Sequence, residues 1–338
     1  MTLEATHRDL FSVTRQLVHP AIRSAVQAYC PSMEPVAGYH AGWLDAAGRP
    51  ATANPGKAVR PTLVLLAAQA TGGTAEAAVP AAVAVELVHD FSLLQDDVID
   101  GDAIRRHRPA AWTVFGSALA TLGSDALLVA AFQVLQDAAF AEPRAATHAL
   151  ADAVQRLIRG QRLDLDFEAS SDVQLADAIR MASDKTGALF ASACSLGALV
   201  SGSAGPVLHA LSGVGEQLGL AFQLVDDMLG IGGDVTSGKP VGSDLRRHKK
   251  SLPVVAALRS STRAADRLAE FYATAHPSEA DVQEAAALVE EAGGRAWARC
   301  EADTRLASAT QILDGLGLST ASTGPFLDLI GFLAARTS

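Results

Sequence analysis

The amino-acid sequence predicts an all-α protein, and three observations support this fold class. Alanine and leucine, both strong helix formers, are abundant, and aromatic residues make up only 5% of the chain. Apolar residues recur at the spacing of amphipathic or buried helices. The alternation of polar and apolar residues that marks β-strands is scarce.

The helices are expected in order along the chain, with glycine- and proline-rich breaks between them. Residues 31–61 predict a structured loop, because glycine and proline recur within it. Helical spacing follows from 61 to about 140, with an interruption at 101–109. No extended linker is visible, so we expect a single domain over residues 1–338. The remaining predictions are helices over 145–167, 173–202 and 212–229, a loop over 230–250, and amphipathic helix from 264 onward with breaks at 293–294 and 315–324.

The composition excludes several classes of protein. Hydrophobic residues make up 49% of the 338 residues and charged residues 19%, so we expect a large core rather than disorder. A formal net charge of −10 argues against nucleic acid as a partner. The three cysteines are isolated, which fits reduced thiols in a cytoplasmic protein.

Neither a signal peptide nor a membrane span is expected. Residues 1–10 carry charges and lack the apolar core of a signal peptide. The stretch from 186 to 215 has no charged residue and is long enough to raise the question of a span. The break at 202–206 divides it, so we expect two buried helices instead.

Two acidic clusters inside apolar helical stretches are the strongest functional signal. Asp96, Asp97 and Asp100 form the first, and Asp226 and Asp227 form the second. Carboxylates rarely occupy apolar helices unless something compensates their charge. Asp96 and Asp100 share one helix face, whereas Asp97 points about 100° away. Clusters that face each other across one cavity would suit Mg²⁺, which prefers carboxylate and phosphate oxygens.

Each cluster also has a simpler interpretation. The first fits the solvated face of an amphipathic helix, and the second fits an acidic helix C-terminus. Most neighbours of the first cluster are apolar, and the helix macrodipole disfavours carboxylates at a C-terminus. Two such clusters in one chain therefore favour the metal-binding interpretation.

Basic residues accompany the acidic clusters. Any one of them is usually an ordinary surface charge, but arginine beside carboxylates suits recognition of phosphate. Together they would neutralise two diphosphates rather than one. These residues are Lys57 and Arg60, the run from Arg105 to Arg108, Lys185, Lys239, and Lys249 with Lys250.

An ordered series of motifs runs from residue 56 to residue 253. It comprises GKAVRP at 56–61, ELVHDFSLLQDDVIDGDAIRR at 86–106, GSD at 123–125, GQRLDL at 160–165, KTG at 185–187, FQLVDD at 222–227 and GKPVGSDL at 238–245. In this order the motifs closely resemble those of the short-chain trans-polyprenyl diphosphate synthases, the farnesyl and geranylgeranyl diphosphate synthase family. A single DDxxD motif would be weak support, whereas the whole series is specific.

The resemblance implies an isoprenoid-synthase-type helical bundle around a deep central cavity, usually in a homodimer with no nucleic-acid partner. It implies a Mg²⁺-dependent head-to-tail condensation of isopentenyl diphosphate with an allylic diphosphate, using three Mg²⁺ ions. The allylic C–O bond would ionise as the leaving diphosphate is stabilised, in a cavity that excludes water. The released diphosphate would take the final proton, so no side-chain base is expected.

The resemblance also assigns roles by position. Asp96, Asp100 and Asp226 would ligate Mg²⁺, with Asp97 and Asp227 in support. The implied catalytic set is Asp96, Asp97, Asp100, Lys185, Asp226 and Lys239. Arg105, Lys185 and Lys239 would hold the allylic diphosphate, with Thr186, Gln223 and Lys249 nearby. Lys57, Arg60, His89 and Arg106 would hold isopentenyl diphosphate, and Asp164 and Asp244 would line the site.

The sequence departs from the family's pattern at three positions. Gly230 stands where the second motif usually ends in aspartate, which predicts weaker metal binding rather than inactivity. His107 replaces a common glycine, and Gln95 replaces a common histidine. The sequence predicts no consequence for either of these two.

Product length is predicted from the residues that precede the first motif. Phe91 lies five residues before Asp96, or about 7.5 Å further along a helix, and Ser92 lies four before. Among relatives, an aromatic residue at this place with an uninterrupted DDxxD is typical of geranylgeranyl diphosphate synthases. The sequence therefore predicts a C20 product, with farnesyl diphosphate as the alternative. Phe91 would otherwise be ordinary core packing.

Two rival functions use some of the same residues. A class I terpene cyclase also needs an aspartate-rich helix, but its second metal motif is not recognisable, and Lys57, Arg60 and Arg106 would have no role in it. A non-catalytic partner subunit of another synthase is the second rival. The intact acidic clusters oppose it, whereas Gly230 keeps it open.

Overall fold

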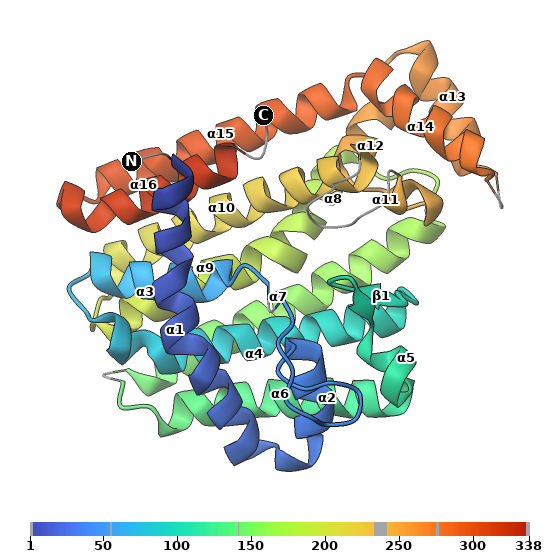
Figure 1. Cartoon of the computed structure of the whole chain (residues 1–338). Helices are drawn as coiled ribbons and strands as arrows, with labels where there is room; N and C mark the ends of the chain where they lie inside the picture. Colours follow the sequence, from blue (N-terminus) through green and yellow to red (C-terminus); the bar gives the residue numbers. More distant parts are fainter. Residues whose placement is uncertain (1–2, 55, 141, 233–241, 275–276, 336–338) are drawn as a thin grey trace. The chain divides into compact units, whose positions relative to one another are not determined.

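The fold is almost entirely helical, as the sequence predicts (Figure 1). The structure is a computed structural model that describes residues 3–54, 56–140, 142–232, 242–274 and 277–335, with side chains from residue 11. The only strands in these ranges are β1 (Ile104–Arg105) and β2 (Arg108–Pro109), which pair antiparallel. The helices are α1 (Leu3–Tyr29), α2 (Glu34–Ala41), α3 (Val59–Ala70), α4 (Ala75–Ile99), α5 (Ala111–Phe115), α6 (Ser117–Asp137), α7 (Pro143–Ala169), α8 (Leu175–Ala182), α9 (Ala188–Val200), α10 (Gly205–Gly232), α11 (Ser243–Arg246), α12 (Leu252–Leu258), α13 (Arg263–Tyr272), α14 (Glu279–Glu291), α15 (Gly294–Gly315) and α16 (Thr320–Ala334), with short helical turns η1 (Pro31–Met33) and η2 (Ser183–Gly187).

The chain packs into two compact units made of interleaved segments. Unit 1 comprises Met1–Asp152, Ser192–Ser212 and Leu316–Leu329, and unit 2 comprises Ala153–Ala191, Gly213–Gly315 and Ile330–Ser338. Helices α7, α9, α10 and α16 each contribute residues to both units. This division does not test the expectation of one domain, which stays a prediction.

Helix α4 is the central helix of unit 1. It packs against α3, α6 and α1, and Figure 1 shows α4 and α6 side by side. A helix surrounded in this way needs apolar residues around most of its circumference, and α4 has them. The Thr74 side chain accepts a hydrogen bond from the Ala77 N–H and so begins the helix. Its C-terminal end carries the first acidic cluster.

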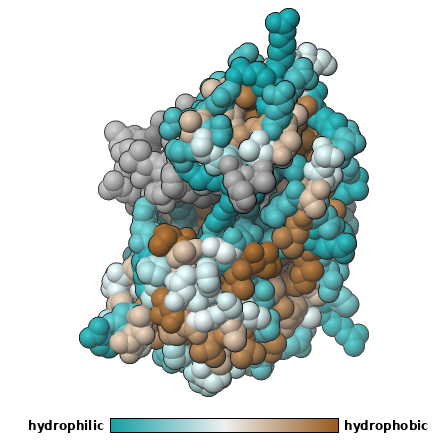
Figure 2. Space-filling model, turned by 90° about the vertical axis from the view of Figure 1, so that its right-hand side faces the viewer, coloured by the Kyte–Doolittle hydropathy of each residue, from teal (hydrophilic) through white to brown (hydrophobic). Residues whose placement is uncertain are grey.

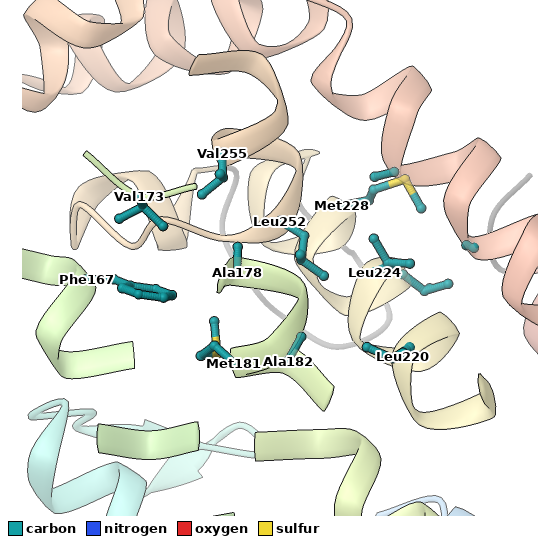
Figure 3. Packing of buried hydrophobic residues seen from close by; sticks show 13 residues of the cluster. Phe167, Val173, Ala178, Met181, Ala182, Leu220, Leu224, Met228, Leu252 and Val255 are labelled. Atoms are coloured by element: carbon teal, nitrogen blue, oxygen red, sulfur yellow. The ribbon is translucent and has the colours of Figure 1, made fainter. Parts of the chain in front are cut away.

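A hydrophobic cluster organises unit 2 (Figure 3). Leu220, Leu224 and Met228 recur every four residues on α10 and so lie on one face of that helix. They pack with buried residues of α7, α8, α12 and α15. Because this packing fixes the rotation of α10 about its axis, it also sets the direction of the polar residues between them. The other members that Figure 3 labels are Phe167, Val173, Ala178, Met181, Ala182, Leu252 and Val255.

The loop predicted over residues 31–61 is wrong in part, because it contains η1 and α2. Helix α2 holds both a proline and a glycine, which concealed it in the sequence. It ends where Gly42 takes a left-handed φ of 90°, a conformation that favours glycine.

Two further boundaries differ from the predictions. The loop predicted over 230–250 begins later, since α10 continues to Gly232, and it contains α11; residues 233–241 lie outside the described residues. In the C-terminal part, α13 ends at Tyr272, before α14 begins at Glu279, a break that the sequence did not predict. The predicted break at 293–294 is confirmed, since α15 begins at Gly294, but the break predicted over 315–324 is shorter, because α16 begins at Thr320.

Within the described residues, α4 and α6 are long and apolar enough to cross a membrane by length and composition alone. The apolar window of α4 is 67% buried inside the protein, as expected of a core helix, and that of α6 is 44% buried. The uncharged stretch from 186 to 215 is divided into α9 and α10, as predicted.

The close contact between α9 and α10 generates a prediction. A Cβ at Gly215 would lie 2.4 Å from the Phe190 carbonyl oxygen, whereas a Cβ at Gly213, in the same helix, would lie 3.6 Å from Ile312 Cδ1. Gly215→Ala should therefore lower the free energy of unfolding by about 1–3 kcal/mol. Gly213→Ala should leave it unchanged or raise it by up to about 1 kcal/mol, because alanine favours helix. Chemical denaturation measures both, and equal effects would contradict the close contact.

Candidate active site

The first acidic cluster lies at the C-terminal end of α4. Asp96 and Asp100 are one helical turn apart and partly exposed, and the Asp100 N–H donates to the Asp96 carbonyl at 2.8 Å. Asp97 points away from them, as helix geometry requires, and is only 1% exposed. Its Oδ1 accepts a hydrogen bond from Arg105 Nε at 2.8 Å, and its buried Oδ2 has no partner among the described residues.

The hairpin of β1 and β2 positions the arginines that follow this cluster. Its two-residue turn consists of Arg106 and His107, with φ angles of 50° and 63°. Two positive φ angles are the mark of a type I′ turn, in which glycine is favoured. Position 107 therefore suits the glycine that the resemblance leads us to expect there. The turn holds both residues in a conformation that is strained for non-glycine residues.

Three of the predicted isopentenyl-diphosphate residues lie in one buried region of unit 1. Arg60 Nη1 lies 3.1 Å from His89 Nε2. Arg106 Nη2 lies 4.0 Å from Asp90 Oδ1, which also contacts His40 Nε2 at 3.3 Å. Lys57 is exposed in the segment before α3. That segment passes close to Arg106, because a Cβ at Gly56 would lie 3.2 Å from Arg106 Nη2.

The electrostatics of this region keep one histidine neutral. Burial, followed by the charges of Arg60 and Arg106, holds the pKa of His89 well below its usual value. Burial, together with the charge of Asp90, raises the pKa of Glu86 to about 7. A neutral imidazole between guanidinium groups donates a hydrogen bond without adding charge, which suits binding of a phosphate oxygen.

The sequence analysis did not single out His40, Glu86 or Asp90, although all three are buried in this region. Asp90 pairs with His40 and Arg106, and these two partners hold its pKa down although burial opposes its charge. The available signal was a carboxylate directly after His89 in an apolar helix.

In unit 2, a π-helical turn carries the KTG motif. In η2 the Ala188 N–H donates to the Ser183 carbonyl, five residues back, which widens the helix between α8 and α9. A Cβ at Gly160 would lie 2.3 Å from the backbone nitrogen of Lys185, so only glycine allows α7 to approach η2 so closely. Arg156 and Arg159 fix the turn through Asp184, with Nε–Oδ distances of 2.9 Å and 2.7 Å. Such widened turns occur often at functional sites.

A chain of hydrogen bonds joins this turn to the second acidic cluster. The Thr186 hydroxyl donates to Gln223 Oε1 at 2.6 Å, and Gln223 Nε2 donates to Asp227 Oδ1 at 2.6 Å. The Leu252 N–H donates to the other oxygen of Asp227 at 2.9 Å. Burial, followed by the charge of Asp244, raises the pKa of Asp227 to about 7. The hydrogen bonds from Gln223 and Leu252 hold Asp227 inside the protein, whereas Asp226 is partly exposed.

The other predicted residues of unit 2 are placed as follows. Lys185 Nζ forms an ion pair with Asp164 Oδ2 at 2.6 Å. The carbonyl of Lys249 accepts a hydrogen bond from the Tyr272 hydroxyl at 2.9 Å, which anchors the backbone of this partly exposed lysine. Lys239 lies outside the described residues. Gln161 is 9% exposed, and its amide oxygen and nitrogen both lack partners in the described part of the chain. Its place in the GQRLDL motif was the signal that could have identified it.

Phe91 and Ser92 are both buried on α4. The Ser92 hydroxyl donates to the His89 carbonyl at 2.7 Å, so it is satisfied within its own helix. Gln95, another of the three departures from the family pattern, donates from Nε2 to the Ser124 hydroxyl at 2.7 Å and so joins α4 to the GSD segment of α6.

The carboxylates present are suited to Mg²⁺. Those of Asp96 and Asp100 lie at the C-terminal end of α4, where the helix dipole favours a cation. Asp226 lies within the last two turns of α10. Among the described side chains, no three of His, Cys, Asp or Glu form a ready metal cluster. Mg²⁺ is commonly held by one or two carboxylates with substrate phosphates and water, so pairs of carboxylates fit this ion.

The predicted residues thus form two sets. Asp96, Asp97, Asp100, Lys57, Arg60, His89, Phe91, Ser92, Arg105 and Arg106 lie in unit 1, and Lys185, Thr186, Gln223, Asp226 and Lys249 lie in unit 2. The expectation that the two acidic clusters face each other across one cavity stays a prediction.

Comparison with known proteins identifies the family. Residues 41–289 match the polyprenyl synthetase family. The chain belongs to this family. It is 41% identical to the (2E,6E)-farnesyl diphosphate synthase of Mycobacterium tuberculosis, over 98% of this chain and 94% of the relative. It is 44% identical to the geranylgeranyl diphosphate synthase of the same organism, over 87% and 85%. The crystal structure of a polyprenyl synthetase from Streptomyces coelicolor A3(2) superposes with a TM-score of 0.92 at 45% identity, covering 96% of this chain and 99% of the other.

These similarities confirm the predicted family, the all-α isoprenoid-synthase fold and the reaction class. The protein is a trans-prenyltransferase that makes prenyl diphosphates. The family uses Mg²⁺, in agreement with the carboxylates described above. Membership of this family favours a synthase over the terpene cyclase and over the non-catalytic subunit.

Proposed function

We propose that this enzyme elongates allylic diphosphates with isopentenyl diphosphate to geranylgeranyl diphosphate, a C20 product. Phe91 is the observation that carries this proposal. Its ring is 7% exposed on α4, just over one helical turn from the metal-binding end. A rigid ring at that depth would stop a growing chain. Farnesyl diphosphate is the alternative, since the two Mycobacterium tuberculosis relatives are nearly equally similar and have different products in their names.

We assign three Mg²⁺ ions to the reaction, with Asp96, Asp100 and Asp226 as their protein ligands. When bound, the ions would stabilise the charge that develops on the leaving diphosphate. Asp97 acts indirectly by holding Arg105, and Asp227 acts indirectly by holding Gln223.

Two groups of residues bind the two diphosphates in this proposal. Arg60, His89 and Arg106, with Lys57 at the surface, bind isopentenyl diphosphate; the contacts among the first three and with Asp90 support this assignment. Arg105, Lys185 and Lys239 bind the allylic diphosphate, with Thr186, Gln223 and Lys249 beside it. Arg105 and Lys185 are already paired with carboxylates, so they reach this ligand with their remaining N–H groups.

The first test is an assay of the purified protein with Mg²⁺, labelled isopentenyl diphosphate, and dimethylallyl, geranyl or farnesyl diphosphate. A C20 diphosphate is expected from each primer. A C15 product would contradict the proposed length, and hydrocarbon from the allylic substrate alone would indicate a cyclase.

Asp96→Ala should abolish turnover by removing a metal ligand, whereas Asp152→Ala, at an exposed carboxylate of α7, should not. Near-normal turnover of Asp96→Ala would remove the support for the metal assignment.

The role of Phe91 has its own test. Phe91→Ala should shift the product beyond C20, because the shortened side chain leaves room for at least one more isoprene unit. Leu268→Ala is the control, since Leu268 is fully buried in a hydrophobic cluster of α12, α13 and α14 to which α4 contributes no residue. Chromatography of the dephosphorylated products measures the lengths. An unchanged product in Phe91→Ala would make this ring ordinary core packing.

We further propose that the enzyme works as a cytoplasmic homodimer. Leu119, Leu122 and Val129 on α6 are 42%, 54% and 58% exposed and follow a helical stripe. Figure 2 shows that hydrophobic groups reach the surface on the face drawn there. Exposed large apolar residues on one helix face commonly mark an interface with another chain.

The homodimer is tested by sedimentation. The wild-type chain should sediment as a dimer, and Leu122→Glu/Val129→Glu should sediment as a monomer because charges would be buried at the interface. Gln283→Glu, at an exposed position of α14, should leave the dimer unchanged. A wild-type monomer, or a dimer that tolerates the double change, would contradict an α6 interface.

A further inference from the structure

The place of the missing aspartate in the second acidic cluster is taken by another carboxylate. A Cβ at Gly230 would lie 2.2 Å from Oδ2 of Asp244, 2.6 Å from its Cγ and 3.0 Å from its Oδ1. Real Cβ atoms do not approach other atoms so closely, so no side chain fits at position 230 while Asp244 keeps its place. The carboxylate of Asp244 therefore lies where a side chain of residue 230 would begin.

Backbone contacts hold Asp244 in this position. The Gly242 N–H donates to the Ile231 carbonyl at 3.0 Å, which ties the start of α11 to the end of α10. The Ser243 hydroxyl contacts the Gly230 carbonyl and Asp244 Oδ1, each at 3.3 Å. The Lys249 N–H donates to the Asp244 carbonyl at 3.0 Å and closes the turn on the other side. These contacts fix the backbone around Asp244 and so keep its carboxylate beside Gly230.

Position 230 lies one helical turn beyond Asp226, so a side chain there would share a helix face with Asp226. A carboxylate that reaches the same place from α11 would supply a second carboxylate on that face. Two carboxylates one turn apart are also what Asp96 and Asp100 provide on α4. Such a pair leaves room for diphosphate oxygens in the coordination shell of Mg²⁺.

We propose that Asp244 is the third carboxylate of the second acidic cluster and holds Mg²⁺ together with Asp226, and that residue 230 is glycine because Asp244 needs its space. This inference rests on the proposed magnesium function. The sequence analysis predicted weaker metal binding because residue 230 is glycine. If Asp244 supplies the carboxylate instead, metal binding should not be weakened.

Metal binding tests the proposal without any turnover. Mn²⁺ is the probe, because binding to protein removes the paramagnetic resonance signal of the free ion, and Mg²⁺ competition identifies shared sites. Asp226→Asn defines the sites of the second cluster. Asp244→Asn should weaken Mn²⁺ binding at those same sites about 10- to 100-fold. Gly230→Asp/Asp244→Ala, which moves the carboxylate to position 230, should restore most of the affinity. Asp266→Asn, at an exposed carboxylate of α13, is the control and should change nothing.

Thermal unfolding tests the steric part separately. Gly230→Ala should lower the melting temperature by several degrees when Asp244 is present, and should raise it or leave it unchanged in an Asp244→Ala background. Gly230→Asp alone should be destabilising although it restores the usual motif, because it adds both a clash and a like charge. If Gly230→Ala has the same effect in both backgrounds, Asp244 does not occupy the space of a side chain at position 230, and the proposal is wrong.

The outcomes separate this inference from the function on which it rests. If Asp226→Asn weakens Mn²⁺ binding and Asp244→Asn does not, only the role of Asp244 is overturned. If neither change affects Mn²⁺ binding, the magnesium assignment of the second cluster is overturned with it. Prenyl transfer by the wild-type chain is measured in parallel and decides the catalytic function independently of both.

Discussion

The structure depends on how negative charge is accommodated inside a largely apolar helical protein. Asp90, Asp97 and Asp227 are buried and each has polar partners, although burial still raises the pKa of Asp227 to about 7. Asp97 has Arg105, Asp90 has His40 and Arg106, and Asp227 has Gln223 and a backbone N–H. Carboxylates without such groups would be protonated or would destabilise the fold. The partly exposed Asp96, Asp100 and Asp226 remain as the carboxylates that can take up a cation.

Buried and partly exposed carboxylates have different roles in the proposed site. In the proposed site, buried aspartates hold side chains that would contact the substrates, such as Arg105 and Gln223, and partly exposed aspartates would bind the metal. The two roles alternate along the helices because neighbouring residues point about 100° apart. A motif of adjacent aspartates therefore directs one residue to the protein interior and one toward the surface, which is a direct consequence of helix geometry.

Close contacts at glycine residues are the second feature on which the proposed site depends. Glycine at 160 allows α7 to approach the π turn of Lys185, and glycine at 230 leaves space for Asp244. These glycines lie inside helices, where they lower helix stability relative to alanine by about 1 kcal/mol. They are tolerated because the helices are held by tertiary packing, as the cluster around Leu224 shows.

The sequence by itself determined the helical class, the family and the identity of the acidic and basic motifs, because these depend on local periodicity and on the order of short segments. Tertiary structure decided what adjacent residues in one motif do. It showed that Asp97 pairs with Arg105, that His107 occupies a turn position suited to glycine, and that His40, Glu86 and Asp90 belong to the buried region around Arg106. It also showed that Asp244 fills the space beside Gly230. Contacts between residues far apart in the chain leave no periodic trace in the sequence, so only the folded structure could place Asp244 beside a residue fourteen positions earlier.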